Sequence, residues 1–131
     1  MIQTVRLQGE DKKLYELVAP LVMDPKVLHA NNNYPFKTGE NFVWFIAVEE
    51  NKVVGFIPVE QRGNQAIVNN YYIGSKRGEV LPTLLQAIIS YYENAEEWII
   101  SSVTLIEDRD EFIQQGFTID REWTRYLKMS R

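Results

Sequence analysis

The sequence predicts an α/β fold of the α+β kind, in which a mixed, mostly antiparallel sheet of six or seven strands carries helices on both faces. Three apolar runs separated by turn residues predict an antiparallel meander. Leucine and isoleucine residues at helical spacing follow the meander, and a strand, a helix and a strand complete the order. The predicted strands are Ile2–Leu7, Phe42–Glu49, Val53–Val59, Gln65–Ile73, Glu97–Val103 and Phe117–Met129.

Two helices are predicted before the meander. Asp11 can cap the first, and Pro20 kinks or ends it because proline lacks the amide hydrogen that a helix interior uses. Asp24 followed by Pro25 repeats the capping signal, since proline is favoured at the first helical position. A short helix is therefore expected over Lys26–His29.

Two more helices are predicted after the meander. The apolar positions of the first are Leu81, Leu84, Leu85, Ile88 and Tyr92. Thr104 and Glu107 form a capping box for the second, which is expected over Leu105–Gln115. Gly116 is placed to end that helix in the left-handed conformation.

Turn residues separate the strands of the meander, and two asparagines lie within its third strand. Glu50-Asn51 joins its first two strands, and Gly63-Asn64 can make the tight turn into the third. Asn69 and Asn70 interrupt the otherwise apolar third strand, where a buried amide without a partner costs about 1–3 kcal/mol. They indicate either a β-bulge whose polar groups face a ligand or exposure at the strand edge.

Length and composition predict one globular domain spanning residues 1–131. The formal net charge is -4, and 45% of the residues are hydrophobic. The acidic balance argues against nucleic-acid binding, which rests on clustered Lys and Arg. No apolar run approaches the roughly 20 residues of a membrane helix, and the alternating N-terminal segment differs from a signal peptide. We therefore expect a cytoplasmic protein with no membrane association.

Cysteine is absent, and His29 is the one histidine. The absence of cysteine removes disulfides, thiolate nucleophiles and zinc-thiolate sites together. A single histidine also argues against a histidine-rich metal site. We therefore expect chemistry that needs no metal.

A short basic loop, Gly74-Ser75-Lys76-Arg77-Gly78, precedes the third helix. The first amides of a helix have no intrahelical partners, and the helix dipole places partial positive charge there, so a phosphate can be held by main chain. Lys76 and Arg77 add full charges. An ordinary exposed turn that caps a helix would use the same residues.

Three segments carry a family resemblance: WFIAVEENKVVGF from Trp44, YYIGSKRG from Tyr71 and EFIQQGF from Glu111. With the order of elements around them, the chain resembles the GNAT (Gcn5-related N-acetyltransferase) family over nearly its whole length. In that family the fourth and fifth strands splay apart and acetyl-CoA lies in the gap. The resemblance places the pyrophosphate on Gly74–Val80 and the pantetheine along Asn70–Ile73. It implies as cofactor-binding residues Tyr71, Tyr72, Ile73, Gly74, Ser75, Lys76, Arg77 and Gly78.

Two departures from the family pattern bear on this resemblance. The loop keeps one glycine, Gly78, and Pro82 removes an amide donor from the helix start. Many family members have a tyrosine four residues before the glycine of GF, where it protonates the departing thiolate. Phe112 stands there and has no hydroxyl, so Tyr91, Tyr126 or water would have to serve.

The acceptor side is less well defined by sequence. The candidate substrate-binding residues are Tyr34, Phe36, Asn69 and Asn70. Aromatic residues beside a strand fit a core equally well. Glu60 and Glu97 are the candidate bases, and the sequence does not choose between them. Acidic residues at Glu40, Glu49 and Glu50 would favour a cationic amine acceptor.

Three classes of function follow. The first is an acetyl-CoA-dependent N-acetyltransferase that acts on a small-molecule or peptide amine by direct acyl transfer. The alternative is a non-catalytic binding or interaction module with a GNAT-like fold, which both departures favour. A structural subunit whose sheet edge pairs with a second copy, as a homodimer, is left open by the sequence.

Overall fold

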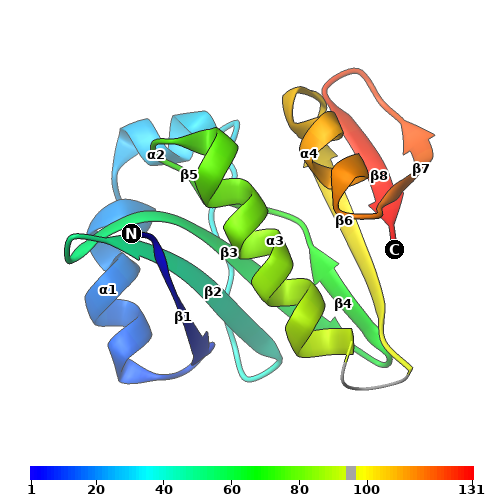
Figure 1. The fold of residues 1–131 in the computed structure, drawn as a ribbon. Helices are drawn as coiled ribbons and strands as arrows, with labels where there is room; N and C mark the ends of the chain where they lie inside the picture. Colours follow the sequence, from blue (N-terminus) through cyan, green and yellow to red (C-terminus); the bar gives the residue numbers. More distant parts are fainter. Residues whose placement is uncertain (94–96) are drawn as a thin grey trace.

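The computed structural model describes residues 1–93 and 97–131, in which eight strands form one sheet (Figure 1). The strand order is β1-β2-β3-β4-β6-β8-β7, and β5 pairs with β3 beside this path. The strands are β1 (Gln3–Gln8), β2 (Phe42–Glu49), β3 (Lys52–Arg62), β4 (Gln65–Val68), β5 (Tyr72–Ile73), β6 (Ile99–Leu105), β7 (Thr118–Glu122) and β8 (Tyr126–Ser130). The helices are α1 (Lys12–Val22), α2 (Pro25–Ala30), α3 (Arg77–Glu93), the 3-10 turn η1 (Ile106–Asp108) and α4 (Arg109–Gln114).

The predicted mixed, mostly antiparallel sheet is confirmed. The pair β4–β6 is parallel, and the other strand pairs of the described residues are antiparallel. Glu50 and Asn51 both have positive φ, 51° and 65°, as in the two-residue turns that match the twist of a hairpin. The strand number exceeds the predicted six or seven because two predicted strands each divide. The segment 65–73 becomes β4 and β5, and the segment 117–129 becomes the hairpin β7–β8.

Two helices differ from prediction near their ends. Pro20, predicted to kink or end the first helix, lies inside α1, which continues to Val22, so it does not end that helix. The capping box does not form: Thr104 is buried in β6 and its hydroxyl contacts that of Ser102 at 2.8 Å. The packing of β6 against β8 holds Thr104 in the sheet, and the helix starts later than predicted. Gly116, at φ 95°, ends α4 as predicted. Among the described residues, no helix combines the length and apolar character needed to cross a membrane.

Helices pack on both faces of the sheet, as predicted. On one face, Leu14 and Val18 of α1 and Val27 of α2 pack against Trp44 and Phe56. On the other face, α3 and α4 cover a larger core that reaches from β2 to β8 (Figure 1). The α1–α2 pair reaches only the β1–β2–β3 side, which leaves the α1–α2 face of β4 and β6 uncovered by helix (Figure 1).

Candidate active site

The sheet opens between β4 and β6. The two strands pair in parallel from Gln65 with Ile99 to Val68 with Ser102. Beyond that point β5 pairs only with β3, and the end of β6 pairs only with β8. A gap therefore forms between residues 69–73 and residues 103–105.

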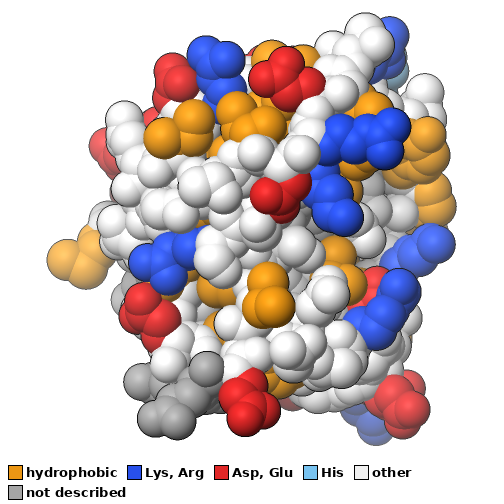
Figure 2. All heavy atoms as spheres, turned by 90° about the vertical axis from the view of Figure 1, so that its right-hand side faces the viewer, with side chains coloured by type: hydrophobic (Ala, Val, Ile, Leu, Met, Phe, Trp, Pro, Cys, Tyr) orange, Lys and Arg blue, Asp and Glu red, His pale blue; other side chains and the backbone are white. Residues whose placement is uncertain are grey.

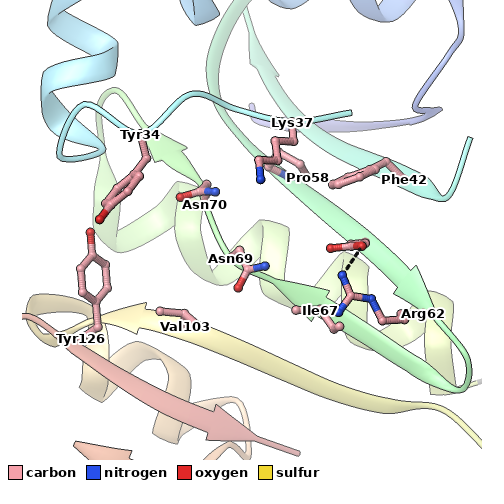
Figure 3. A pocket seen from close by; sticks show the side chains of 11 residues that line it. Tyr34, Lys37, Phe42, Pro58, Arg62, Ile67, Asn69, Asn70, Val103 and Tyr126 are labelled. Atoms are coloured by element: carbon pink, nitrogen blue, oxygen red, sulfur yellow. Dashed lines mark hydrogen bonds and ion pairs between the residues drawn. The ribbon is translucent and has the colours of Figure 1, made fainter. Parts of the chain in front are cut away.

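A β-bulge lies at the start of this gap. Val68 pairs with Val59 and Tyr72 with Phe56, so three residues, 69–71, face two residues of β3. Such an insertion leaves main-chain groups unpaired and turns consecutive side chains to one face. Asn69 and Asn70 accordingly both line the same cavity (Figure 3), and Asn69 is exposed. Of the two alternatives that the sequence left open, the structure has the bulge, and that bulge also exposes Asn69.

This cavity, here called the bulge cavity, measures about 430 Å³ and lies on the α1–α2 face of the sheet. Aromatic, amide, charged and aliphatic side chains all contribute to its wall, and the hydroxyl ends of Tyr34 and Tyr126 point toward each other at one side (Figure 3). The lining residues are Tyr34, Lys37, Phe42, Pro58, Glu60, Arg62, Ile67, Asn69, Asn70, Val103 and Tyr126.

Two asparagines of the loop after α2 shape the bulge cavity. The Asn31 side-chain amide, 7% exposed, donates to the Tyr34 carbonyl at 2.9 Å and to Oδ1 of Asn70 at 3.1 Å. The Asn32 amide donates to the Tyr126 hydroxyl, which ties this loop to β8. These contacts fix Asn70 and close one wall of the cavity.

Glu60 is the carboxylate of the bulge cavity. Its Oε2 accepts from Arg62 at 2.8 Å and from the Asn41 amide at 3.3 Å, and its side chain is 16% exposed. Glu97, the other candidate base, lies in an exposed turn before β6 and does not line any of the three cavities described here. The structure thus brings Glu60, and not Glu97, together with Asn69 and Asn70.

The basic loop leads into α3 on the far side of the gap. Lys76 has φ 47°, and its carbonyl accepts from the amides of Glu79 and Val80 at 2.8 and 2.9 Å. Within the described residues, the amides of Arg77 and Gly78 form no hydrogen bond. A Cβ added at Gly78 would meet nothing within 4 Å, so there is open space beside this residue. The start of α3 can therefore present main-chain donors to an anion.

Both cations of the loop are already paired with carboxylates. The Lys76 ammonium lies 3.0 Å from Glu49 at the β2–β3 hairpin, and this hydrogen bond raises the pKa of Lys76. Arg77 donates from Nε and Nη2 to the two oxygens of Asp108, at 2.6 and 2.7 Å. That hydrogen-bonded pair raises the pKa of Arg77.

Asp108 also accepts a hydrogen bond from Tyr71, so Arg77, Asp108 and Tyr71 form one cluster across the gap. The Tyr71 hydroxyl donates to Oδ2 of Asp108 at 2.6 Å and accepts from the Leu105 amide at 3.1 Å. Burial is the main cause that raises the pKa of Tyr71 well above its usual value, and the Asp108 carboxylate adds to it. Tyr71 and Asp108 are 5% and 1% exposed. The side chain of Tyr71 therefore bridges the two strands that border the gap.

A second cavity lies beyond this bridge. It measures about 610 Å³, and its walls come from α2, the start of α3, η1 and the turn before β8. The lining residues are Ala30, Asn32, Arg77, Leu105, Ile106, Glu107, Thr124 and Arg125. Tyr71 and the Asn32–Tyr126 contact separate this cavity, here called the α3 cavity, from the bulge cavity.

The remaining candidates have core positions. Phe36 packs edge-on against Phe56 at 4.9 Å and is absent from the lining of the bulge cavity. Tyr72 packs on Phe56 from the same face, whereas Ile73 joins Tyr71 in the α3–α4 core. Gly74 donates its amide to the Val54 carbonyl at 2.8 Å, so by strand alternation the main-chain groups of Ile73 point toward the gap.

Phe112 belongs to the same core. Its ring is fully buried between Tyr71, 6.1 Å away between centroids, and Phe117, 5.2 Å away. The Phe112 ring thus contacts that of Tyr71, the residue whose side chain bridges the gap. No local pattern points to Asp108, Asn31 or Lys37. Asp108 and Asn31 act through contacts with residues distant in the chain, and the fold alone brings Lys37 to the wall of the bulge cavity.

Comparison by sequence finds neither a matching family model nor a matching curated protein. Comparison of folds finds many solved structures. Escherichia coli ElaA aligns at 13% identity over 100% of this chain and 99% of its own, with a TM-score of 0.77. Tetrahymena GCN5 aligns at 12% identity over 98% and 94%, with a TM-score of 0.70. The chain has the GNAT fold.

A third structure with the GNAT fold bears on ligands. The PaiA N-acetyltransferase of Thermoplasma acidophilum, solved in complex with coenzyme A, aligns at 12% identity with a TM-score of 0.66, over 100% of this chain and 98% of its own. In the present chain, the amides of Arg77 and Gly78 form no hydrogen bond within the described residues. The side chain of Tyr71 crosses the gap and accepts a hydrogen bond from the Leu105 amide.

Proposed function

We propose that this protein transfers an acetyl group from acetyl-CoA to an amine by direct transfer. The observation that carries the proposal is the bulge at residues 69–71, which lies at the opening between β4 and β6 with a cavity on one side and the free amides of α3 on the other. Acetyl-CoA would supply an activated acetyl thioester. The resemblance in fold to N-acetyltransferases supports this reading.

The residues divide into two groups by position. The amides of Arg77 and Gly78 would bind phosphate, and the main chain of residues 71–73 would border the thioester arm. Asn69 and Asn70 would hold the amine, since both side chains line the bulge cavity. Three residues face two in the bulge, so it can supply an unpaired amide that polarises the acyl oxygen.

Two proton transfers accompany the reaction, one from the amine to Glu60 and one from water to the thiolate. Glu60, directly or through water, would take the proton that the amine loses as the nitrogen–carbon bond forms and the carbon–sulfur bond breaks. Phe112 has no proton to give, so the departing thiolate would take one from water. General acid catalysis typically contributes about 10²–10⁴-fold, so we expect slow turnover.

The second candidate is a non-catalytic module with the same fold. The observation that favours it is the Tyr71–Asp108–Arg77 cluster, which fills the gap and holds one of the two loop cations. A protein locked in this state would keep its cavities and lose the path between them. A homodimer through a sheet edge stays a prediction for either candidate.

Calorimetric titration with CoA and acetyl-CoA, followed by thiol release with a panel of amines, tests the proposal. Gly78→Glu places a carboxylate beside the α3 amides in open space, so it should abolish binding without destabilising the fold. Gln86→Glu adds the same charge at an exposed position two turns along α3 and serves as the control. Binding without thiol release would favour the non-catalytic module. No binding would end the acetyl-CoA proposal.

A further inference from the structure

Cations outnumber carboxylates around the bulge cavity. Lys37 and Arg62 line it together with Glu60. A third cavity of about 280 Å³ shares Glu60, Arg62, Ile67, Asn69 and Val103 with it and adds Lys128. Glu60 is the one carboxylate among the residues that line the two cavities.

Glu60 offsets the charge of Arg62 and leaves that of Lys37 uncompensated. Its carboxylate is already paired with Arg62 at 2.8 Å and accepts from Asn41. Within the described residues, the Lys37 ammonium has no hydrogen bond or ion pair, and Figure 3 shows it on the same side of the cavity as Pro58. A ligand group at this end therefore meets unpaired positive charge.

The acidic residues that the sequence offered for a cationic acceptor lie elsewhere. Glu49 pairs with Lys76 and lies near the N-terminal ammonium, at the β2–β3 hairpin. Glu50 is in the hairpin turn, and Glu40 is exposed in the loop before β2. None of the three lines the bulge cavity. The three acidic residues therefore give no reason to expect a cationic acceptor in the bulge cavity.

Strand geometry sets the spacing between the two ends of the cavity. The bulge begins at Asn69, and Ile67, two residues earlier, pairs with Glu60. Two residues of a strand span about 7 Å. The Glu60–Arg62 pair therefore lies about 7 Å along the strand from Asn69. Lys37 lies nearer to Asn69 and Asn70, because it is beside Pro58, the residue next to Val59 in the register with Val68 (Figure 3). A molecule with its amine at Asn69 and Asn70 would have a second group within reach of Lys37.

The cations form a local group, not a broad basic surface. Figure 2, which views the molecule from the β7–β8 side, shows Lys and Arg side chains with Asp and Glu between them. The chain as a whole carries a net charge of -4. A discrete anionic group on a small molecule fits this distribution better than a polyanion does.

We infer that the amine acceptor carries an anionic group, a carboxylate or a phosphate, a few bonds from its amine, and that Lys37 recognises that group. This inference rests on the proposed function. It assigns Lys37 to specificity and leaves the acyl-transfer step unchanged.

A matched series of small amines tests the inference by thiol release from acetyl-CoA. The series is 4-aminobutanoate, 3-aminopropyl phosphate, 1-aminobutane and 1,4-diaminobutane. We expect KM for at least one of the two anionic amines to be about tenfold or more below that for the neutral and dicationic ones, since hydrogen bonds to charged groups are the stronger kind. The better anionic amine identifies the group as carboxylate or phosphate. Equal KM values across the series would overturn the inference.

A charge reversal at Lys37 is the second test of the inference. Lys37→Glu should raise KM for the preferred anionic amine about tenfold with little change in kcat, and should not raise KM for 1,4-diaminobutane. Lys52→Glu, an equal reversal at an exposed site beside the hairpin turn, should leave both KM values unchanged. An effect at Lys52 equal to that at Lys37 would contradict local recognition.

A binding measurement keeps the two proposals separate. If no amine releases thiol, the transfer proposal fails, and the anionic and dicationic amines are then titrated by NMR against the side-chain amides of Asn69 and Asn70. Shifts that saturate with an anionic amine and not with the diamine, and that weaken in Lys37→Glu, would support the inference alone. The absence of such a preference would overturn it.

Discussion

Tyr71 and Asp108 lie where the phosphate loop, the gap and the larger core meet. Asp108 is 1% exposed, yet three donors, two from Arg77 and one from Tyr71, satisfy its oxygens. Charge-assisted hydrogen bonds of this kind are stronger than neutral ones, and removing one partner leaves a buried charge less well satisfied. Arg77 is consequently a structural residue as well as a candidate phosphate ligand.

The first prediction concerns the pH dependence of stability through Tyr71. Its pKa is raised in the folded protein, so its contribution is fully present below the ordinary tyrosine pKa of about 10 and is lost as the pH rises above that value. The raised pKa of Tyr92, caused by burial, adds to the same alkaline loss. Urea unfolding between pH 9 and 11 should show a loss in Tyr71→Phe that is shallower by up to about 1.4 kcal/mol per pH unit. Parallel curves for the two proteins would show that Tyr71 does not titrate differently on folding.

The second prediction concerns Phe112. Its ring is fully buried between Tyr71 and Phe117, so Phe112→Tyr adds a hydroxyl to a packed core. An unpaired buried hydroxyl costs about 1–3 kcal/mol, and we expect a loss of that size in the free energy of unfolding from urea titration. Unchanged stability together with faster thiol release would mean instead that the hydroxyl reaches the gap and acts as the missing acid.

At the scale of elements, the gap is formed by strands that pair with each other and then separate. β4 and β6 pair over four residues, after which β5 stays with β3 and β6 stays with β8. The cluster at Asp108 rejoins the two sides by linking the start of α3 to η1. Its strength therefore controls how easily the gap opens.

The third prediction tests this link. Asp108→Asn removes the charge that holds Arg77 and Tyr71, so the free energy of unfolding should fall by about 1–3 kcal/mol while CoA binds more tightly, because Arg77 becomes free for phosphate. Asp110→Asn is the matched control, since Asp110 is exposed and contacts only Arg109, at 3.6 Å. Calorimetric titration measures the CoA affinity of both variants. An affinity of Asp108→Asn equal to that of Asp110→Asn would show that the cluster does not restrict CoA binding.

The fourth prediction concerns the close approach of β3, β5 and α3. A Cβ at Gly55 would lie 2.9 Å from the Tyr72 carbonyl oxygen and 2.9 Å from a methyl group of Val80. Gly55→Ala should therefore cost about 1–3 kcal/mol by overpacking. Gly78→Ala, which meets nothing within 4 Å inside a helix, should leave stability unchanged or raise it. A thermal melt that ranks the two variants the other way round would contradict this packing.

At the scale of the whole molecule, charge is distributed unevenly over the fold. The net charge is -4, while the α3 cavity is lined by Arg77, Arg125 and Glu107, and the bulge cavity by Lys37, Arg62 and Glu60. Arg77 is paired with Asp108 and Arg62 with Glu60. Cations thus outnumber carboxylates by one among the residues that line each cavity, which favours an anionic group there.

The fifth prediction follows from this distribution. Because the cations of the α3 cavity are partly exposed, salt screens them, and raising the ionic strength from about 0.05 to 0.5 M should weaken CoA binding severalfold. Calorimetric titrations at a series of salt concentrations measure the slope. An affinity that does not depend on salt would mean that main-chain amides alone hold the phosphates.

The sequence by itself determined the features that depend on neighbours along the chain. Apolar alternation gave the strands of the meander, Glu50-Asn51 and Gly63 gave its turns, and Asn69-Asn70 indicated the bulge. These signals act over a few residues, because backbone conformation and side-chain alternation are local properties. The order of elements was therefore predictable, whereas the opening between two strands was expected only from the resemblance to the GNAT family.

Only the tertiary structure decided which charged and polar groups meet. Tyr71 reaches Asp108 across 37 positions of sequence, and Lys76 reaches Glu49 across 27. Thr104 stayed in β6 although its local pattern favoured a helix cap, because pairing with β8 outweighed that pattern. Long-range pairings depend on strand register and on burial, where a carboxylate without partners costs too much to persist. The chemistry of the gap is therefore a property of the folded molecule.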